Sequence, residues 1–182
     1  MITVVLLLSV VMLGISIDRN RWTQGVAGGF VVLAMEEGEE SDYVMPYPGV
    51  LPDSPLYIVK MVRDWLREVL SVAPEDKVEL FNQYADKRVG AMEALMRGGK
   101  FELAVETGEK GAMYQERAIG ALETVKARGG DVGKGGNVLE RAILKHVEIV
   151  RKLSEENETV DLTGLIGSME RHYDEVKKVL GR

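Results

Sequence analysis

The chain has 182 residues, which is the size of about one domain. It contains no cysteine, and this excludes a disulfide framework, a thiolate metal site, an iron–sulfur cluster and a cysteine nucleophile. The net charge is −6, with basic residues scattered among carboxylates, and this argues against binding to nucleic acid.

The N-terminal part of the chain is strongly hydrophobic. Residues 2–17 carry no charged side chain, and a second apolar run extends from Trp22 to Met35. Two arginines precede the second run and small residues end it, which is the order of a secretory signal peptide. We therefore expect residues 1–35 to be a signal peptide or a membrane anchor.

The start of translation affects this interpretation. A start at Met12 in place of Met1 would give a signal peptide of more usual length. In either case we expect the rest of the chain to be extracytoplasmic, at the cell surface or in the periplasm. It would be secreted, or tethered to the membrane through residues 1–35 if they are not cleaved.

Residues 36–53 form an acidic and then proline-rich hinge. Four prolines fall within ten residues, between positions 46 and 55. Proline fixes φ and removes a backbone donor, so the segment is expected to be extended or turning. Its tyrosine, valine, methionine and leucine side chains predict that it lies along the protein surface.

Residues 54–182 have the pattern of a helical domain. Ser54 and Pro55 read as the N-cap and first residue of a helix over residues 54–71. Pro74 opens a second amphipathic helix, which the glycine pair at 98–99 ends. Further apolar stripes predict helices at about 100–128, 138–156 and 161–180, with the glycine-rich stretch 129–136 as a loop.

No segment alternates between apolar and polar residues over a length that suggests a strand. The predicted fold class is all-α, an antiparallel bundle of four to five helices. Four glycines interrupt the helical patterns, and they predict either close helix crossings or a slot for a ligand: Gly90, Gly108, Gly111 and Gly120.

The sequence PYPGVLPDSPLYIVKMVRD at residues 46–64 resembles the opening of an uncharacterised bacterial and archaeal family of exported helical domains. The resemblance extends over residues 43–155 and implies an extracytoplasmic α-helical domain of unknown function, without supplying an activity.

Residues 98–104 are also similar to the turn between paired tetratricopeptide helices, although no second copy follows with a 34-residue period.

The search for reactive groups finds no catalytic residue. No nucleophile elbow, P-loop or dinucleotide fingerprint is present. His146 is a weak metal candidate because it falls on an apolar helical stripe, where a histidine is usually a hydrogen-bonded core residue. Asn157 begins an Asn-Glu-Thr sequon and is a weak candidate for glycosylation.

Aromatic side chains are concentrated between the hinge and the second helix. They predict either a clamp that holds the hinge down or a surface that binds a partner. The candidate partner-binding residues are Tyr47, Tyr57, Trp65 and Tyr84.

The sequence therefore favours a non-enzymatic, exported or membrane-tethered helical domain. We expect it to bind a protein partner or to form a homo-oligomer, and we expect no cofactor. Two alternatives stay open. One is a bundle that binds a small ligand or a metal at the glycine-lined face with His146, and the other is a tetratricopeptide-like module that binds a peptide.

Overall fold

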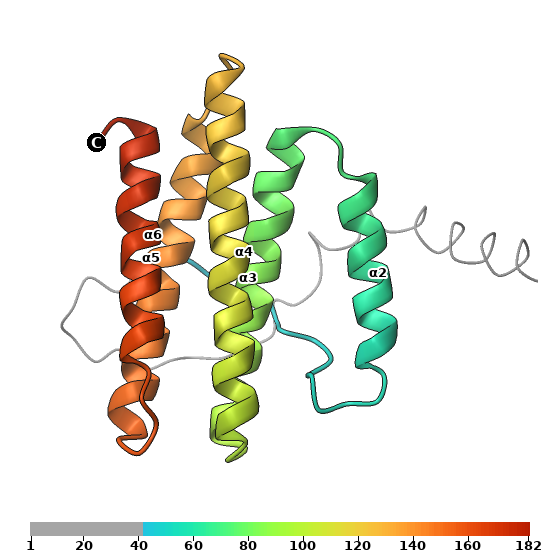
Figure 1. Cartoon of the computed structure of the whole chain (residues 1–182), viewed down its shortest axis with the longest axis vertical. Coiled ribbons are helices and arrows are strands. Elements are labelled where there is room, and N and C mark those ends of the chain that lie inside the picture. The colour runs from blue at the N-terminus through green and yellow to red at the C-terminus, as the bar shows by residue number, and fades with distance from the viewer. Residues whose placement is uncertain (1–41) are drawn as a thin grey trace, which may run out of the picture. The chain divides into compact units, whose positions relative to one another are not determined.

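The structure of the chain is a computed structural model that describes residues 42–182 (Figure 1). The expected signal peptide or anchor at residues 1–35 lies outside these residues. Within them every regular element is a helix, so the predicted all-α class is confirmed. The helices are α2 (Tyr57–Leu70), α3 (Pro74–Arg97), α4 (Phe101–Ala127), α5 (Gly133–Glu156) and α6 (Thr163–Leu180).

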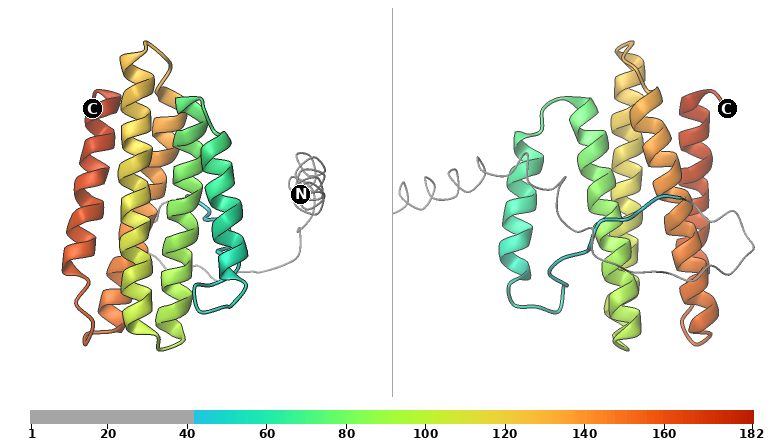
Figure 2. Two further views of the ribbon diagram at one scale, coloured as in Figure 1. Left: turned by 45° about the vertical axis from the view of Figure 1, so that its right-hand side comes forward. Right: turned by 180° about the vertical axis from the view of Figure 1, so that it is seen from behind.

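Helices α3 to α6 form a four-helix bundle in which successive helices run in opposite directions (Figure 1). Helix α3 packs mainly against α4, and α5 mainly against α6. Helix α2 lies beside α3 at the edge of the bundle (Figure 2). Residues 42–56 form a strap that leads to it, extended at first and turning from residue 52 onward. None of the helices within residues 42–182 has the length and apolar composition that a membrane span requires.

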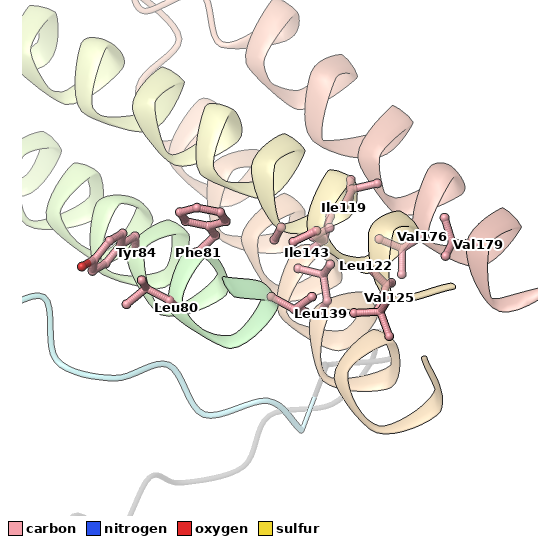
Figure 3. Packing of buried hydrophobic residues seen from close by; sticks show 13 residues of the cluster. Leu80, Phe81, Tyr84, Ile119, Leu122, Val125, Leu139, Ile143, Val176 and Val179 are labelled. Carbon is pink, nitrogen blue, oxygen red and sulfur yellow. The ribbon is translucent and has the colours of Figure 1, made fainter. Parts of the chain in front are cut away.

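The core consists of two apolar clusters, one in each half of the bundle. Figure 3 shows part of the first cluster, in which α3, α4, α5 and α6 contribute, among others, Phe81, Leu122, Ile143 and Val176. The same four helices build the second cluster from side chains that include Met92, Ala104, Val150 and Met169. Because each helix contributes to both clusters, its apolar stripe is buried along most of its length.

The predicted helix starts differ from the structure in two places. Ser54 and Pro55 belong to a turn in which the Tyr57 amide donates to the Ser54 carbonyl (3.0 Å), and α2 begins only after it. Helix α5 begins at Gly133, inside the stretch that we predicted to be a loop. The Asp131 carboxylate accepts a hydrogen bond from the Gly133 amide at 2.8 Å, which stabilises this early start.

Two glycines, Gly108 in α4 and Gly136 in α5, mark close helix crossings. A Cβ atom on Gly108 would lie 2.4 Å from Met92 Sδ and 2.8 Å from Leu165 Cδ2. A Cβ atom on Gly136 would lie 2.6 Å from Leu180 Cδ2. Side chains of neighbouring helices thus fill the space that a ligand slot would need, and the close-crossing interpretation is the one that the packing supports.

A pair of alanine substitutions in α4 separates packing from helix propensity. Gly120 is exposed and has open space around its Cβ position, so Gly120→Ala should raise the free energy of unfolding by about 1 kcal/mol. Gly108→Ala gains the same helix propensity, but its methyl group crowds Met92 and Leu165. This crowding should lower the free energy of unfolding by about 1–3 kcal/mol. Urea unfolding measures both variants, and an equal stabilisation by the two would contradict the close crossing.

Candidate functional site

A layer of polar side chains lies between the two apolar clusters. Each helix of the bundle contributes one member at the position between its two sets of core residues: Asp86 from α3, Gln115 from α4, His146 from α5 and His172 from α6. These residues form one continuous hydrogen-bonded chain, which we call the polar layer.

The distances in the polar layer are those of ordinary hydrogen bonds. His146 Nε2 lies 2.8 Å from Asp86 Oδ1, and its Nδ1 lies 2.7 Å from Gln115 Nε2. The Oε1 atom of Gln115 lies 3.0 Å from His172 Nδ1. The layer therefore crosses all four helices without a gap.

The direction of each bond follows from the chemistry of the groups. An ionised Asp86 can only accept, so His146 Nε2–H donates to it. The Gln115 amide nitrogen can only donate, so His146 Nδ1 accepts and the ring is neutral in this arrangement. Gln115 Oε1 then accepts from His172 Nδ1–H.

The strap is joined to this layer through Tyr43. The Tyr43 hydroxyl group donates to Asp86 Oδ2 at 2.8 Å and accepts from Asn82 Nδ2 at 3.1 Å. Burial, followed by the adjacent Asp86 charge, raises the pKa of Tyr43 well above its ordinary value, so this tyrosine stays a neutral donor. Both oxygens of the Asp86 carboxylate are thus hydrogen-bonded.

Three of the four members of the polar layer are closed to solvent, and only His172 is partly exposed. Asp86 is 1% exposed, while Gln115 and His146 are 0% exposed, so a substrate cannot reach the histidine–carboxylate pair. Both ring nitrogens of His146 are already hydrogen-bonded. Within the described part of the chain no three histidine or carboxylate side chains gather in a way that could hold a metal ion. The layer therefore acts as a structural element of the bundle.

Breaking the polar layer should be costly. His146→Leu leaves Asp86 Oδ1 and Gln115 Nε2 buried without a partner, and the free energy of unfolding should fall by about 3–5 kcal/mol. The double variant His146→Leu/Asp86→Leu should recover part of this loss, because it removes the unpaired charge as well.

Chemical denaturation measures these variants, with Glu106→Ala as the control. That substitution breaks the exposed pair between Glu106 and Lys110 and should leave the denaturation midpoint unchanged. A His146→Leu variant as stable as the parent chain would contradict a structural role for the layer.

The half-buried His172 should make stability depend on pH. Burial lowers its pKa from the ordinary value of 6.5, although Glu175 and Glu116 act in the opposite direction. The unfolded chain therefore binds the proton more readily, and stability is fully present above about pH 6.5 and declines as the pH falls below it.

His172→Asn tests this dependence, because it keeps a donor for Gln115 but does not titrate. Urea unfolding at about pH 7.5 and about pH 5.5 should show a smaller loss of stability in the variant than in the parent chain. The same loss in both proteins would assign the pH dependence to other groups.

Helix α2 is attached to the bundle by its polar side. The Tyr84 hydroxyl group donates to the Asp64 carbonyl at 2.8 Å, and Glu68 forms an ion pair with Arg117 of α4. The Arg88 guanidinium lies 5.2 Å from the centre of the Tyr57 ring. These contacts turn the charged side of α2 inward.

Lys60 extends this attachment to the strap. Its Nζ atom donates to the carbonyl groups of Pro48 (3.0 Å) and Val50 (3.2 Å), and burial lowers its pKa. The strap in turn lies against α3 and α5, where Pro48 packs on Gly90 and lines a surface pocket with Ile149. Strap and α2 are therefore held as one unit.

The apolar side of α2 faces away from the bundle. Nine large apolar side chains on and beside this helix are at least half exposed, and no residue of α2 is buried. We call these nine residues the α2 face: Leu56, Ile58, Val59, Met61, Val62, Trp65, Val69, Leu70 and Val72. A monomeric protein seldom exposes so large an apolar patch without a function.

The structure separates the four predicted partner-binding residues. Trp65 lies in the α2 face and is 63% exposed, and Tyr47 lies on the strap and is 84% exposed. Tyr57 is half-buried beside Arg88. Tyr84 is 3% exposed and stacks edge-on against Tyr114, and burial raises its pKa to about 12. Tyr84 therefore holds α2 to the bundle and does not face a partner.

Sequence reasoning identified Trp65 as a candidate partner-binding residue but did not predict the rest of the α2 face, because it treated this helix as one more helix of the bundle. The apolar stripe itself is visible in the sequence, but the direction in which it faces depends on where Tyr84 and Arg117 hold the polar side of the helix.

The sequon residue Asn157 is half-buried after α5, and its Nδ2 atom, to which a glycan would be attached, donates to the Leu153 carbonyl at 2.9 Å.

Comparison with known proteins places the chain in a family. Residues 49–161, more than half of the chain, match the model of a domain of unknown function, DUF5667. The match begins within the proline-rich strap and ends just before α6. No curated protein and no solved structure matches the chain.

Proposed function

The chain belongs to the DUF5667 family, whose function is unknown, and we propose that it is a non-enzymatic helical domain that binds protein through the α2 face. The proposal includes export of the domain, or its tethering to the membrane through residues 1–35. The two apolar runs before the described residues support this location. The proline-rich opening, which resembles that of exported helical domains, also supports this location.

The observation that carries the proposal is the outward direction of the α2 face. Burying a valine, leucine or isoleucine side chain stabilises a fold by about 1.5–3 kcal/mol. The nine apolar residues of the α2 face are largely exposed and contribute little of this stabilisation. The helix is held instead by polar contacts that leave its apolar side free. A partner that covers the face would recover the missing hydrophobic energy.

The alternatives have less support. A pocket of about 600 Å³ lies near the starts of α3 and α5, but its lining includes neither His146 nor the glycines of the α4 crossing. The tetratricopeptide alternative requires two helices within 34 residues, whereas α3 and α4 alone have 24 and 27.

Photo-crosslinking in cells that produce the full chain tests the proposal. A photoreactive residue in place of Val62 should give protein adducts of defined mass, and the same residue in place of the exposed Glu175 on α6 should not. Protease added to intact cells, with the outer membrane permeabilised where there is one, should digest the domain. A protected domain would contradict export, and a Val62 position without adducts would contradict binding.

A further inference from the structure

We propose that the α2 face is the contact surface of a homodimer, in which it packs against the α2 face of a second copy of this chain. This inference rests on the proposed function, because it names the protein partner that covers the face. Three features of the described residues support it: the spacing of the apolar side chains, the area that they offer and the distribution of charge.

The spacing is that of a helix that packs against another helix. Ile58, Val62, Trp65 and Val69 follow one another at intervals of four, three and four residues. This alternation keeps side chains on one seam of an α-helix and is the pattern of paired helices. All four side chains are more than half exposed, and they run along the whole of α2.

The apolar area that the α2 face exposes is comparable to what one partner buries in a standard interface. A largely exposed aliphatic side chain offers roughly 100 Å² of apolar surface, so the nine residues of the α2 face offer about 900 Å². A standard protein interface buries about 800 Å² on each partner. Trp65 lies in the middle of the face, where a large aromatic side chain contributes most to binding.

The distribution of charge favours a second copy over a charged partner. The chain is acidic overall, and two copies would repel each other over much of their surface. On α2, however, Lys60 and Glu68 bind the strap and α4, and Asp64 pairs with Arg63. Two α2 faces can therefore meet without burying a charged group, and a two-fold symmetric contact needs only this one surface.

Single cysteine substitutions test the homodimer, because the chain has no cysteine of its own. Val62 and Trp65 lie near the middle of α2, where a two-fold axis brings each residue close to its own copy. With an added thiol oxidant, full-length Val62→Cys and Trp65→Cys in native membranes should form disulfide-linked species of twice the chain mass. Arg67→Cys, on the polar side of the same helix, is the matched control and should stay monomeric.

A second substitution checks that the α2 face causes the contact. Ile58→Glu in the Val62→Cys chain would bury two unpaired carboxylates per dimer and should weaken dimerisation at least about a hundredfold. Met113→Glu on α4 is the matched control, because Met113 is a comparably exposed apolar residue outside the face. It should leave the disulfide-linked species unchanged. Unaltered thermal unfolding of both variants would show that the fold is intact.

Other outcomes overturn the homodimer in distinct ways. A Val62→Cys chain that links to a different protein would overturn it but leave the proposed binding function in place. Detergent-solubilised chain that is monomeric by light scattering, with no adduct of any kind at Val62, would overturn both. Binding of the full chain to phosphatidylcholine vesicles through Trp65 in the absence of a dimer would assign the face to a lipid surface and overturn the homodimer.

Discussion

The structure depends on one buried carboxylate. Asp86 lies at the centre of the bundle, and a carboxylate in such a place is tolerable only when hydrogen bonds satisfy it. His146 satisfies one oxygen and Tyr43 the other. The first bond aligns α5 with α3, and through Gln115 the alignment reaches α4 and α6. A shift of any helix by one turn would leave a buried polar group without a partner, so the polar layer disfavours other registers of the helices.

The same carboxylate explains the course of the strap. The hydroxyl group of Tyr43 fixes the start of the strap at Asp86, and the prolines hold the strap in extended and turn conformations on its way to α2. The position of α2 follows from this path together with the hydroxyl group of Tyr84 and the guanidinium of Arg117. Those anchors are polar, and they select the polar side of the helix. The apolar side is left on the surface as a consequence of how the helix is attached.

Much of the bundle could be predicted from the sequence. The stop at Gly98 and the start at Pro74 were right for α3, because caps and prolines act locally. His146 was expected among apolar neighbours from its place on the stripe of α5, and it lies there. The prediction that residues 129–136 form a loop was wrong for its last four residues, because Gly136 packs closely against Leu180 and this contact favours a helix that the intrinsic propensity of glycine does not. The partners of His146 could not be predicted, since they come from helices 31 and 60 residues away in the chain.

The amino-acid pattern alone determined that this protein is helical, where most helices begin and end, and which side of each helix is apolar, because these properties depend on neighbours within a few residues. Tertiary structure decided which apolar sides are buried. Helices α3 to α6 turn theirs toward one another, whereas α2 is oriented by distant polar groups on α3 and α4. An amphipathic pattern indicates that a helix has one apolar and one polar side. Which of the two faces the solvent depends on where the residues that attach the helix lie in the fold.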